Sequence, residues 1–458
     1  MNFKSSITIF LVFLISLTSC NSIDQEVENK NVDRTIDITS QLVKITYKIT
    51  LEHKSKKPIT NYVFVLPINE CNKVSIVTAR DAAKKELKLT TSKNSEECAY
   101  TMTLSAGSNP VIYVEAVFSK ALEPYPVAIP QSERQLVRYF GSAYFYSPYK
   151  TLSQKTTIHL ASKSVESYTQ LKPSSQNDAQ IFYGPYENIA PNTKHEIVVH
   201  YENNTPFMTI TRLERTIEIS LWGNVAVEET IDIIHSGALL KGSFSRYDYQ
   251  KDSRSGPASV KSYKTILPAS ATGVYYRDIN GNISTSAMRI LKDSVELDLR
   301  PRFPLFGGWR THYTVGYNVP SFEYLFQSGD NYMLKMRVLD HVFDDMIVDE
   351  LITKVILPEG SKNIKLVTPY TVERKPDSLH FTYLDITGRP VITFRKTNLV
   401  ENHINDFNLK FNFSRIMMLQ EPLLVVVFFY LIFLFVIIWT RLDFSIIKER
   451  ESQHLHKD

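Results

Sequence analysis

The sequence predicts a mainly β protein in which two tandem homologous β-sandwich-like domains precede a single C-terminal transmembrane helix. Three observations lead to this prediction. The chain of 458 residues contains 25 tyrosines and 25 phenylalanines, and aromatic residues favour strands. A strand-like segment occurs once in each half of the chain. A long uncharged apolar run lies close to the C-terminus.

The evidence for two homologous domains begins with a short motif that both halves contain. Arg34–Thr39 reads RTIDIT and Arg215–Ser220 reads RTIEIS. Each motif is followed by a run in which apolar and polar residues alternate, Val43–Leu51 in the first half and Val225–Ile233 in the second. This alternation is typical of a half-buried strand. Glu229 interrupts the apolar face of the second run.

Further matches extend the repeat and divide the chain into domains. The halves share Leu-Pro pairs, Arg-Asp pairs and a later strand-like stretch, at Leu66-Pro67 and Leu267-Pro268, Arg80-Asp81 and Arg277-Asp278, and Thr156–Leu160 and Thr353–Leu357. These matches lie farther from the arginine motif in the second half than in the first, so we predict that the second half contains an insertion at Ser236–Pro257. A polar turn at Asn203–Pro206 separates the copies, which places the first domain at 21–206 and the second at 207–420.

The N-terminus has the pattern of a secretory signal peptide, predicted at residues 1–20. Lys4 precedes an apolar run, Ile7–Leu17, that is too short to span a bilayer. The small residues of Thr18–Cys20 suit a cleavage site. Leu17–Cys20 also resembles a bacterial lipoprotein box. The apolar run near the other end of the chain favours the signal peptide.

That second apolar run predicts a transmembrane helix at 421–440. Leu423–Thr440 contains 18 residues without a charge, which span about 27 Å as a helix. This length suits a thin membrane such as that of the endoplasmic reticulum. Trp439 and Arg441 follow the pattern of a membrane interface. A signal peptide and one later span predict a type I protein, with a lumenal or extracellular bulk and a cytosolic tail at 441–458.

The cysteines predict one disulfide. Cys20 lies at the edge of the signal peptide, which leaves Cys71 and Cys98 as the available pair. In an oxidising compartment such a pair is expected to form a disulfide. The alternative is two free buried thiols.

The chain contains no motif that predicts catalysis, a cofactor or a metal. The sequences GxSxG, HExxH, GxxxxGK[ST] and CxxC do not occur. The best metal candidate is the cluster of His341, Asp344, Asp345, Asp349 and Glu350, which we interpret as a solvated acidic edge because the stretch alternates like a strand. The net charge of +4 is small and no basic aromatic stripe is present, which argues against nucleic acid.

Two segments are candidate protein interfaces. Arg300–Tyr313 combines arginine with aromatic residues, the composition of interface hot spots, and the candidates are Arg302, Phe303, Phe306, Trp309 and Arg310. The alternative is core packing at a domain junction. In the predicted membrane helix, Tyr430 and Phe433 share one face. A tyrosine hydroxyl in hydrocarbon needs a partner, so we expect this face to contact another subunit.

Three sequons are potential N-glycosylation sites on the side of the membrane that holds the bulk of the chain. They begin at Asn203, Asn282 and Asn412.

Several long stretches resemble the ribophorin I family, subunit 1 of the eukaryotic oligosaccharyltransferase complex. They include YFYSPYKT, GSFSRYDYQ, VYYRDINGNIST, RPRFPLFGGWRTHYTVGYN, ILPEG, GRPVI and MLQEPLLVV, at Tyr144–Thr151, Gly242–Gln250, Val274–Thr285, Arg300–Asn318, Ile356–Gly360, Gly388–Ile392 and Met418–Val426. The resemblance covers Arg34 to Lys448. It implies a type I protein of the endoplasmic reticulum whose complex transfers an oligosaccharide from dolichyl pyrophosphate to Asn-x-Ser/Thr.

The resemblance implies a non-catalytic role, because the catalytic centre of the complex lies in a different subunit. The implied partners are the other subunits, including the catalytic one, nascent polypeptides, the endoplasmic reticulum membrane and, as a further candidate, the translocon. The chain departs from the family in two respects. Cys71 and Cys98 match no family cysteine, and the cytosolic ribosome-docking domain of animal members has no counterpart before Asp458. The alternatives are a single-pass adhesion protein at the cell surface and a cryptic enzyme.

Overall fold

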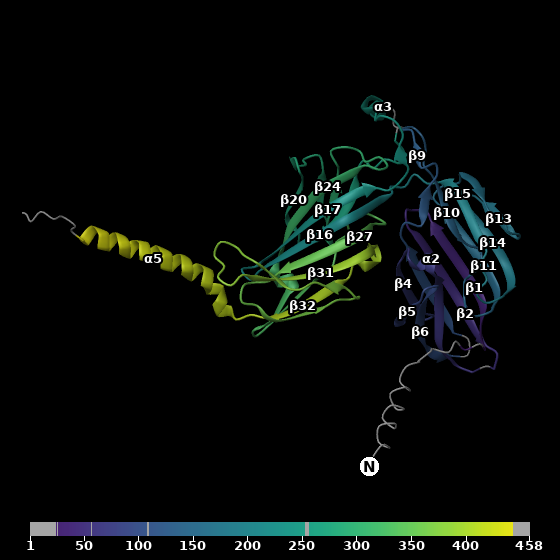
Figure 1. Ribbon diagram of the computed structural model, residues 1–458, viewed down its shortest axis with the longest axis horizontal. Coiled ribbons are helices and arrows are strands. Elements are labelled where there is room, and N and C mark those ends of the chain that lie inside the picture. The colour runs from purple at the N-terminus through teal and green to yellow at the C-terminus, as the bar shows by residue number, and fades with distance from the viewer. Residues whose placement is uncertain (1–23, 25, 56, 108–109, 252–255, 443–458) are drawn as a thin grey trace, which may run out of the picture.

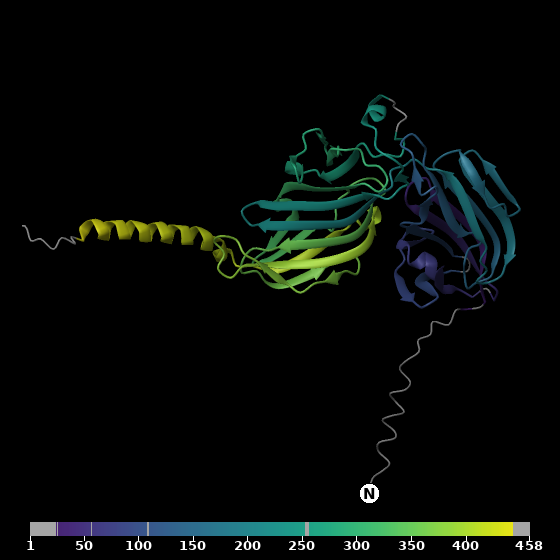
Figure 2. The ribbon, with the colours of Figure 1, turned by 45° about the horizontal axis from the view of Figure 1, so that its top comes forward.

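The computed structural model describes residues 24, 26–55, 57–107, 110–251 and 256–442. The predicted signal peptide with Cys20, and residues 443–458 of the predicted cytosolic tail, lie outside them. Within these residues the protein consists of two β-domains and a long C-terminal helix (Figure 1). The first domain lies at one end, the second in the middle, and the helix projects away from both (Figures 1 and 2). The predicted mainly β fold class is confirmed.

The first domain contains a seven-stranded, a three-stranded and a four-stranded sheet. The seven-stranded sheet has the order β13 (Ser174–Asn177), β14 (Gln180–Ile189), β11 (Thr151–Leu160), β1 (Val27–Ile38), β2 (Val43–His53), β7 (Val111–Phe118) and β4 (Val74–Asp81). The three-stranded sheet has the order β3 (Ile59–Pro67), β6 (Glu97–Gly107) and β5 (Leu89–Lys93). The four-stranded sheet has the order β12 (Val165–Tyr168), β15 (Glu196–Glu202), β10 (Leu136–Ser142) and β8 (Leu122–Pro124). A one-turn helix, α2 (Ile68–Cys71), follows β3.

The second domain repeats this arrangement. Its largest sheet has the order β21 (Gly281–Asn282), β20 (Thr272–Asp278), β24 (Arg310–Pro320), β17 (Asn224–His235), β16 (Met208–Ser220), β27 (Ile347–Ile356), β31 (Arg389–Val400) and β29 (Glu373–Arg374), and β30 (Ser378–His380) also pairs with β31. The three-stranded sheet has the order β19 (Tyr263–Pro268), β23 (Ser294–Leu299) and β22 (Ala287–Ile290). The four-stranded sheet has the order β25 (Leu325–Ser328), β26 (Asn331–Arg337), β32 (Asp406–Asn412) and β28 (Lys362–Val367).

The two domains therefore share one strand order, as the repeated motif predicted. In each, the first strand pairs antiparallel with the next one along the chain and parallel with a later one, β1 with β11 and β16 with β27. The register also agrees, because Arg34 pairs with Thr156 and Arg215 pairs with Thr353. The segment between β15 and β16, which contains the predicted boundary, connects sheets of different domains.

The cores follow from the alternation of the strands. In β2 the apolar residues Val43, Ile45, Tyr47, Ile49 and Leu51 are buried, and the corresponding alternate residues of β17 are buried in the second domain. Each domain has its own large cluster of buried apolar side chains. Burial of apolar surface is the main force that stabilises such sheets.

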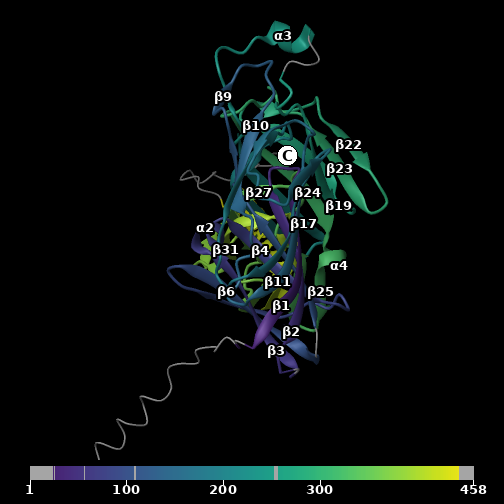
Figure 3. The ribbon, with the colours of Figure 1, turned by 90° about the vertical axis from the view of Figure 1, so that its right-hand side faces the viewer.

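The predicted insertion lies between β17 and β19 and connects the two domains. It contains β18 (Leu239–Leu240) and α3 (Arg246–Lys251). β18 pairs in parallel with β9 (Ala128–Ile129) of the first domain, and α3 lies above β9 in Figures 1 and 3. The Gln131 side chain accepts a hydrogen bond from the Ser245 backbone N–H and donates one to its carbonyl oxygen.

A second contact between the domains involves the acidic stretch around β27. Asp345 accepts from Lys44 at 2.6 Å and Asp349 accepts from Lys120 at 2.7 Å. Nearby, Leu42 and Val117 of the first domain pack against Ile347 and Val400 of the second. The two domains thus meet through an apolar contact with ion pairs at its edge.

The C-terminal helix, α5, spans Gln420–Arg441 and follows a short 3₁₀ helix, η2 (Arg415–Leu419). Its bounds differ from the predicted 421–440 by one residue at each end. It belongs to the one segment, among the described residues, that is helical, long and apolar enough to cross a membrane. None of its side chains is buried by the rest of the chain.

Candidate functional site

The repeated arginine of the sequence motif is buried in both domains but has different partners. Arg34 lies on β1 and donates from Nε to Thr156 Oγ1 at 3.2 Å and from Nη2 to the Ala143 carbonyl oxygen at 2.9 Å. It also donates to the carbonyl oxygens of Ser142 and Tyr144. All these acceptors are neutral. The guanidinium thus links β1 to the segment that follows β10.

Arg215 occupies the same position in the second domain and contacts carboxylates. Its Nη1 donates to Asp340 Oδ2 at 2.7 Å and also to Glu229. The Tyr317 hydroxyl donates to Asp340 as well. Burial raises the pKa of Glu229 to about 7, while the adjacent guanidinium opposes that rise. Arg215, Glu229 and Asp340 are each at most 1% exposed, so we interpret the cluster as structural.

A cleft of about 660 Å³ opens beside α2 in the first domain. Aromatic and apolar side chains line it together with charged ones, namely Val43, Ile45, Phe118, Ala121, Tyr139, Phe140, Tyr146, Glu70, Lys73, Glu123, Lys194 and Glu196. Its size lies in the range of ligand-binding pockets. Apolar walls with a few charged groups suit a peptide or another amphipathic ligand.

Two charged side chains define the chemistry of this cleft. Burial raises the pKa of Glu70, and the charges of Arg34 and Lys194 act in the opposite direction. The Lys194 ammonium lies 4.6 Å from the centre of the Tyr146 ring. The cleft therefore offers a carboxylate and a cation to a ligand that rests on aromatic rings.

An equivalent cavity of about 380 Å³ in the second domain reaches Arg215 and Asp340. Its outer lining includes Lys335, Arg337 and Asp406. It is smaller and more charged than the cleft of the first domain. The two domains therefore have cavities at equivalent positions, and the residues that line these cavities differ.

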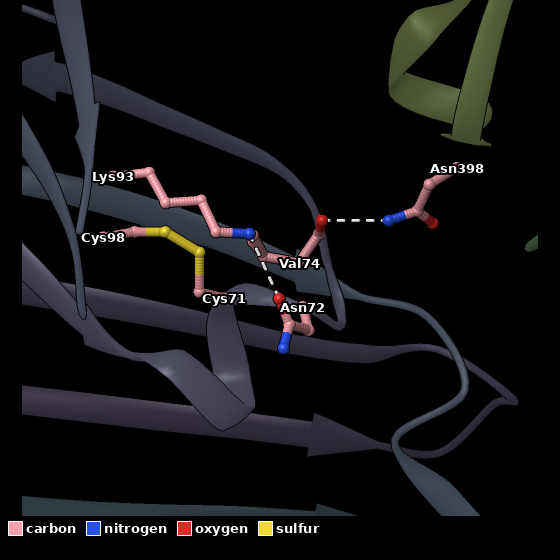
Figure 4. The surroundings of a disulfide bond; sticks show 6 residues. All are labelled: Cys71, Asn72, Val74, Lys93, Cys98 and Asn398. Atoms are coloured by element: carbon pink, nitrogen blue, oxygen red, sulfur yellow. Dashed lines mark hydrogen bonds between the residues drawn. A yellow bond between two sulfur atoms is a disulfide. The ribbon is translucent and has the colours of Figure 1, made fainter. Parts of the chain in front are cut away.

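The predicted disulfide joins Cys71 to Cys98 in the structure, with 6.0 Å between their Cα atoms. It connects the last residue of α2 to β6, and β4 begins shortly after this end of α2 (Figure 4). Lys93 Nζ donates to Asn72 Oδ1 at 3.1 Å, and Asn398 Nδ2 of the second domain donates to the Val74 carbonyl oxygen at 2.9 Å (Figure 4). The bridge therefore fixes a segment that contacts the other domain.

The aromatic interface candidates are divided between packed and exposed positions. Phe306 and Trp309 pack with Phe244 and Tyr249 of the insertion, with ring centres 5.3 to 5.7 Å apart. Gly307 lies against the backbone of Ala238, where an added Cβ would be 1.8 Å from the carbonyl oxygen. This part of the segment is packing at the domain junction, which was the alternative interpretation.

The remaining candidates of that segment stay predictions. Arg302 pairs with Asp278 within the domain and donates to the Gly281 carbonyl oxygen. Arg310 is exposed. Phe303 is 65% exposed and Tyr430 and Phe433 of α5 are 59% and 63% exposed. These three aromatic side chains are therefore available to a partner.

The sequon at Asn203 requires a correction. The Asn203 side chain is 0% exposed. Its Nδ2 donates to the Ser40 carbonyl oxygen and its Oδ1 accepts from the Thr205 hydroxyl at 2.6 Å. A glycan would disrupt these contacts, so we no longer expect one there. Asn282 is exposed, and Asn412 is half-buried at the end of β32.

The acidic cluster that was the best metal candidate in the sequence forms ion pairs in the structure. Asp345 and Asp349 pair with lysines of the first domain, and Glu350 pairs with Arg395. His341 is buried and lies 3.1 Å from Asp344. Among the described residues no group of three or more His, Cys, Asp or Glu side chains is arranged to hold a metal.

Sequence reasoning missed the buried charged cluster and the polar contacts between domains. Glu229 carried a signal, because it stood on an apolar strand face opposite the repeated arginine. Asp340 carried none that could be distinguished from its acidic neighbours. Asn398, which accepts from Ser75 and Ser119 at 2.8 and 2.7 Å, lies on β31 without any local pattern that points to the other domain.

Comparison with known proteins places the chain in a family. The family model for ribophorin I matches residues 27–440. The chain is 43% identical over 444 residues to dolichyl-diphosphooligosaccharide–protein glycosyltransferase subunit 1 of Caenorhabditis elegans, covering 95% of this chain and 76% of that one. It is 36% identical to subunit 1B of Arabidopsis thaliana, covering 96% and 98%.

Solved structures resemble the chain only weakly. An M1 zinc metallopeptidase from Deinococcus radiodurans aligns with a TM-score of 0.27 and 8% identity over 45% of this chain and 42% of that one. Such a likeness says nothing about fold or activity. The match to the family model, which extends from β1 to the end of α5, agrees with the stretches that pointed to the same family, and the chain belongs to the ribophorin I family.

Proposed function

We propose that this protein is a non-catalytic subunit of the oligosaccharyltransferase complex and that it presents acceptor polypeptides to the catalytic subunit. Membership of the ribophorin I family supports the first part. The names of the relatives describe subunits of that glycosyltransferase. No observation favours the alternative of a cell-surface adhesion protein.

We place the protein in the endoplasmic reticulum membrane, with both β-domains in the lumen. The apolar helix α5 supports a single span, and the names of the relatives support the compartment. Depletion of the protein should then leave the sequons of secreted glycoproteins incompletely occupied. Full occupancy after complete loss would contradict a role in the complex.

The cleft beside α2 is the observation that supports presentation of polypeptides. It is aromatic, open to solvent and large enough for several residues of an extended chain. Phe140 lies on its lining and is 37% exposed. A polypeptide could rest on this ring and place a basic side chain near Glu70. An unfolded acceptor exposes the backbone and aromatic groups that such a surface would contact.

Site-specific cross-linking can test this assignment in the intact complex. A photoreactive phenylalanine analogue replaces Phe140, and the control replaces Phe303, which is exposed but lies outside the cleft. We expect the probe at Phe140 to cross-link to an acceptor polypeptide during its glycosylation, and the probe at Phe303 not to do so. Equal labelling from both positions, or none from Phe140, would exclude the cleft as the acceptor surface.

For assembly, we propose that the α5 face containing Tyr430 and Phe433 contacts a helix of another subunit. Both side chains are exposed on the isolated chain. Tyr430→Phe should weaken co-purification of the complex slightly, and Phe433→Ala should weaken it more because it removes packing surface. Replacement of residues 423–440 by an unrelated apolar span must disrupt the complex in detergent. An intact complex would show that the β-domains alone carry the contact.

A further inference from the structure

The end of the second domain from which α5 leaves consists of several loops that converge from distant parts of the chain. The turn between β16 and β17 lies there, since Ser220 and Trp222 line a hollow together with Gln420 of α5. Helix α4 (Ser321–Tyr324) follows β24 at once, and the Ser321 N–H donates to the Gly223 carbonyl oxygen at 3.0 Å. Figure 2 shows α5 leaving the domain at this end.

Large apolar side chains protrude from these loops. Six of them are at least 60% exposed, and we call them the membrane-end ring: Trp222, Phe322, Phe381, Tyr383, Ile386 and Ile416. A soluble surface rarely exposes so many aromatic side chains together, and such patches mark an interaction site. Trp222 lines a hollow together with Met417, Met418 and Gln420 at the start of α5, which places it beside the membrane helix.

Buried polar contacts hold one of these loops against α5. The Glu359 carboxylate accepts from the backbone N–H groups of Ile386, Thr387 and Gly388, and Gln420 Nε2 donates to its other oxygen at 2.8 Å. Phe381 packs against Gly388, where an added Cβ would lie 2.8 Å from the ring. These contacts to one carboxylate hold the loop that contains Ile386 against the start of α5.

A second residue, the half-buried Arg389, continues this connection into the sheet. Arg389 donates to Glu421 at 2.9 Å, to Glu218 at 3.0 Å and to Asp385 at 3.2 Å. Glu421 is at the first turn of α5, Glu218 is on β16, and Asp385 is in the loop before β31. The domain and the membrane helix are therefore joined in one orientation, not by a free linker.

From this arrangement we propose that the membrane-end ring lies in the interfacial layer of the bilayer that α5 crosses. Trp222 and Ile416 lie beside the start of α5, where the chain would enter the membrane, so lipid would be the nearest apolar surface to them. Tryptophan and tyrosine favour this layer because their rings are apolar and their polar atoms can reach water. The exposed cations Lys362 and Arg415 lie at the same end, where they can pair with lipid phosphate.

The three tryptophans of the chain allow a direct test. Single-tryptophan variants of the full chain retain Trp222, Trp309 or Trp439 and carry phenylalanine at the other two positions. Each is placed in phosphatidylcholine nanodiscs whose acyl chains are brominated close to the headgroup, because bromine quenches a nearby indole. Trp309 lies just before β24, and Phe322 of the membrane-end ring lies just after it. The length of this strand therefore separates Trp309 from the ring. Trp309 is thus the matched control.

We expect Trp222 to be quenched at least about twice as strongly as Trp309, as an interfacial indole should be. Quenching of Trp439 would verify that α5 is inserted. Trp222 quenching no stronger than that of Trp309, with Trp439 quenched, would overturn the proposal. The same measurement in the purified complex distinguishes lipid from protein, because loss of Trp222 quenching there would show that another subunit covers the ring.

Discussion

Arg34 and Arg215 occupy equivalent positions in the two domains, yet Arg34 is bound by carbonyl and hydroxyl oxygens and Arg215 by two carboxylates. The difference lies in the neighbouring strands. Arg34 pairs across the sheet with Tyr47, whereas Arg215 pairs with Glu229. A buried arginine in a repeated motif therefore serves as a structural group in both copies, with partners that have diverged.

This difference predicts unequal effects of removing the two arginines. Arg215→Met leaves Glu229 and Asp340 buried without a cation, which should cost about 3–5 kcal/mol of the second domain's stability. Arg34→Met leaves neutral hydrogen-bond acceptors unpaired and removes one of the two cations that act on Glu70, with Lys194 still present, which should cost about 1–3 kcal/mol in the first domain. Hydrogen exchange resolved by peptide can follow β16 and β1 separately in urea. Equal losses in the two domains would contradict the role of the carboxylates.

The pKa of Glu229 predicts a pH dependence. Because burial raises this pKa from 4.5 to about 7, the folded protein binds the proton more tightly than the unfolded chain does. The stability contributed by this group is full below pH 4.5 and is lost as the pH rises through about 7. Between pH 5 and pH 8 the second domain should lose on the order of 1–3 kcal/mol. Urea titration with Trp222 and Trp309 fluorescence measures the change.

Glu229→Gln is the control for that prediction, since the amide keeps the shape and cannot ionise. Its stability should fall less over the same pH range than that of the unmodified protein. A parallel fall in both would assign the pH dependence to other groups.

The disulfide should stabilise both the first domain and its contact with the second. A Cys71→Ser/Cys98→Ser variant loses a cross-link that closes a loop of 27 residues, worth about 3 kcal/mol in the chain-entropy model. It also frees the segment whose Val74 carbonyl oxygen accepts from Asn398. We expect faster protease cleavage within residues 72–96. Peptide mapping without reductant must first find the bridge, and quantitative alkylation of both thiols would rule it out.

The two best-described sequons should differ in occupancy. Asn282 is exposed on β21, whereas Asn203 is fully buried and hydrogen-bonded. Endoglycosidase treatment should shift the mass of the mature protein by the glycan at Asn282, and Asn282→Gln should abolish that part of the shift. Asn203→Gln should leave the glycan mass unchanged but reduce stability, because the longer side chain does not fit the contacts with Ser40 and Thr205. A glycan recovered on Asn203 would show that the folded surroundings differ there.

The sequence by itself determined the class of fold, the duplication and the long apolar helix near the C-terminus. These depend on local patterns, because alternation of side chains along a strand and a long run without charge are set by neighbours in the chain. RTIDIT and RTIEIS predicted two equivalent strands, and the wider spacing in the second half located the insertion before β19. The long stretches shared with the ribophorin I family located the chain in that family.

Only the tertiary structure decided what surrounds each of these elements. The chain brings Arg215 beside Asp340, Asn398 beside Val74, and Glu359 beside Gln420, and no local pattern encodes such pairs. Asn203 matched an acceptor motif that depends on three residues, whereas its burial depends on Ser40 and on the closing of the domain. Side-chain periodicity fixes which face of a strand is buried. The partners on that face are fixed by the packing of strands that are far apart in the sequence.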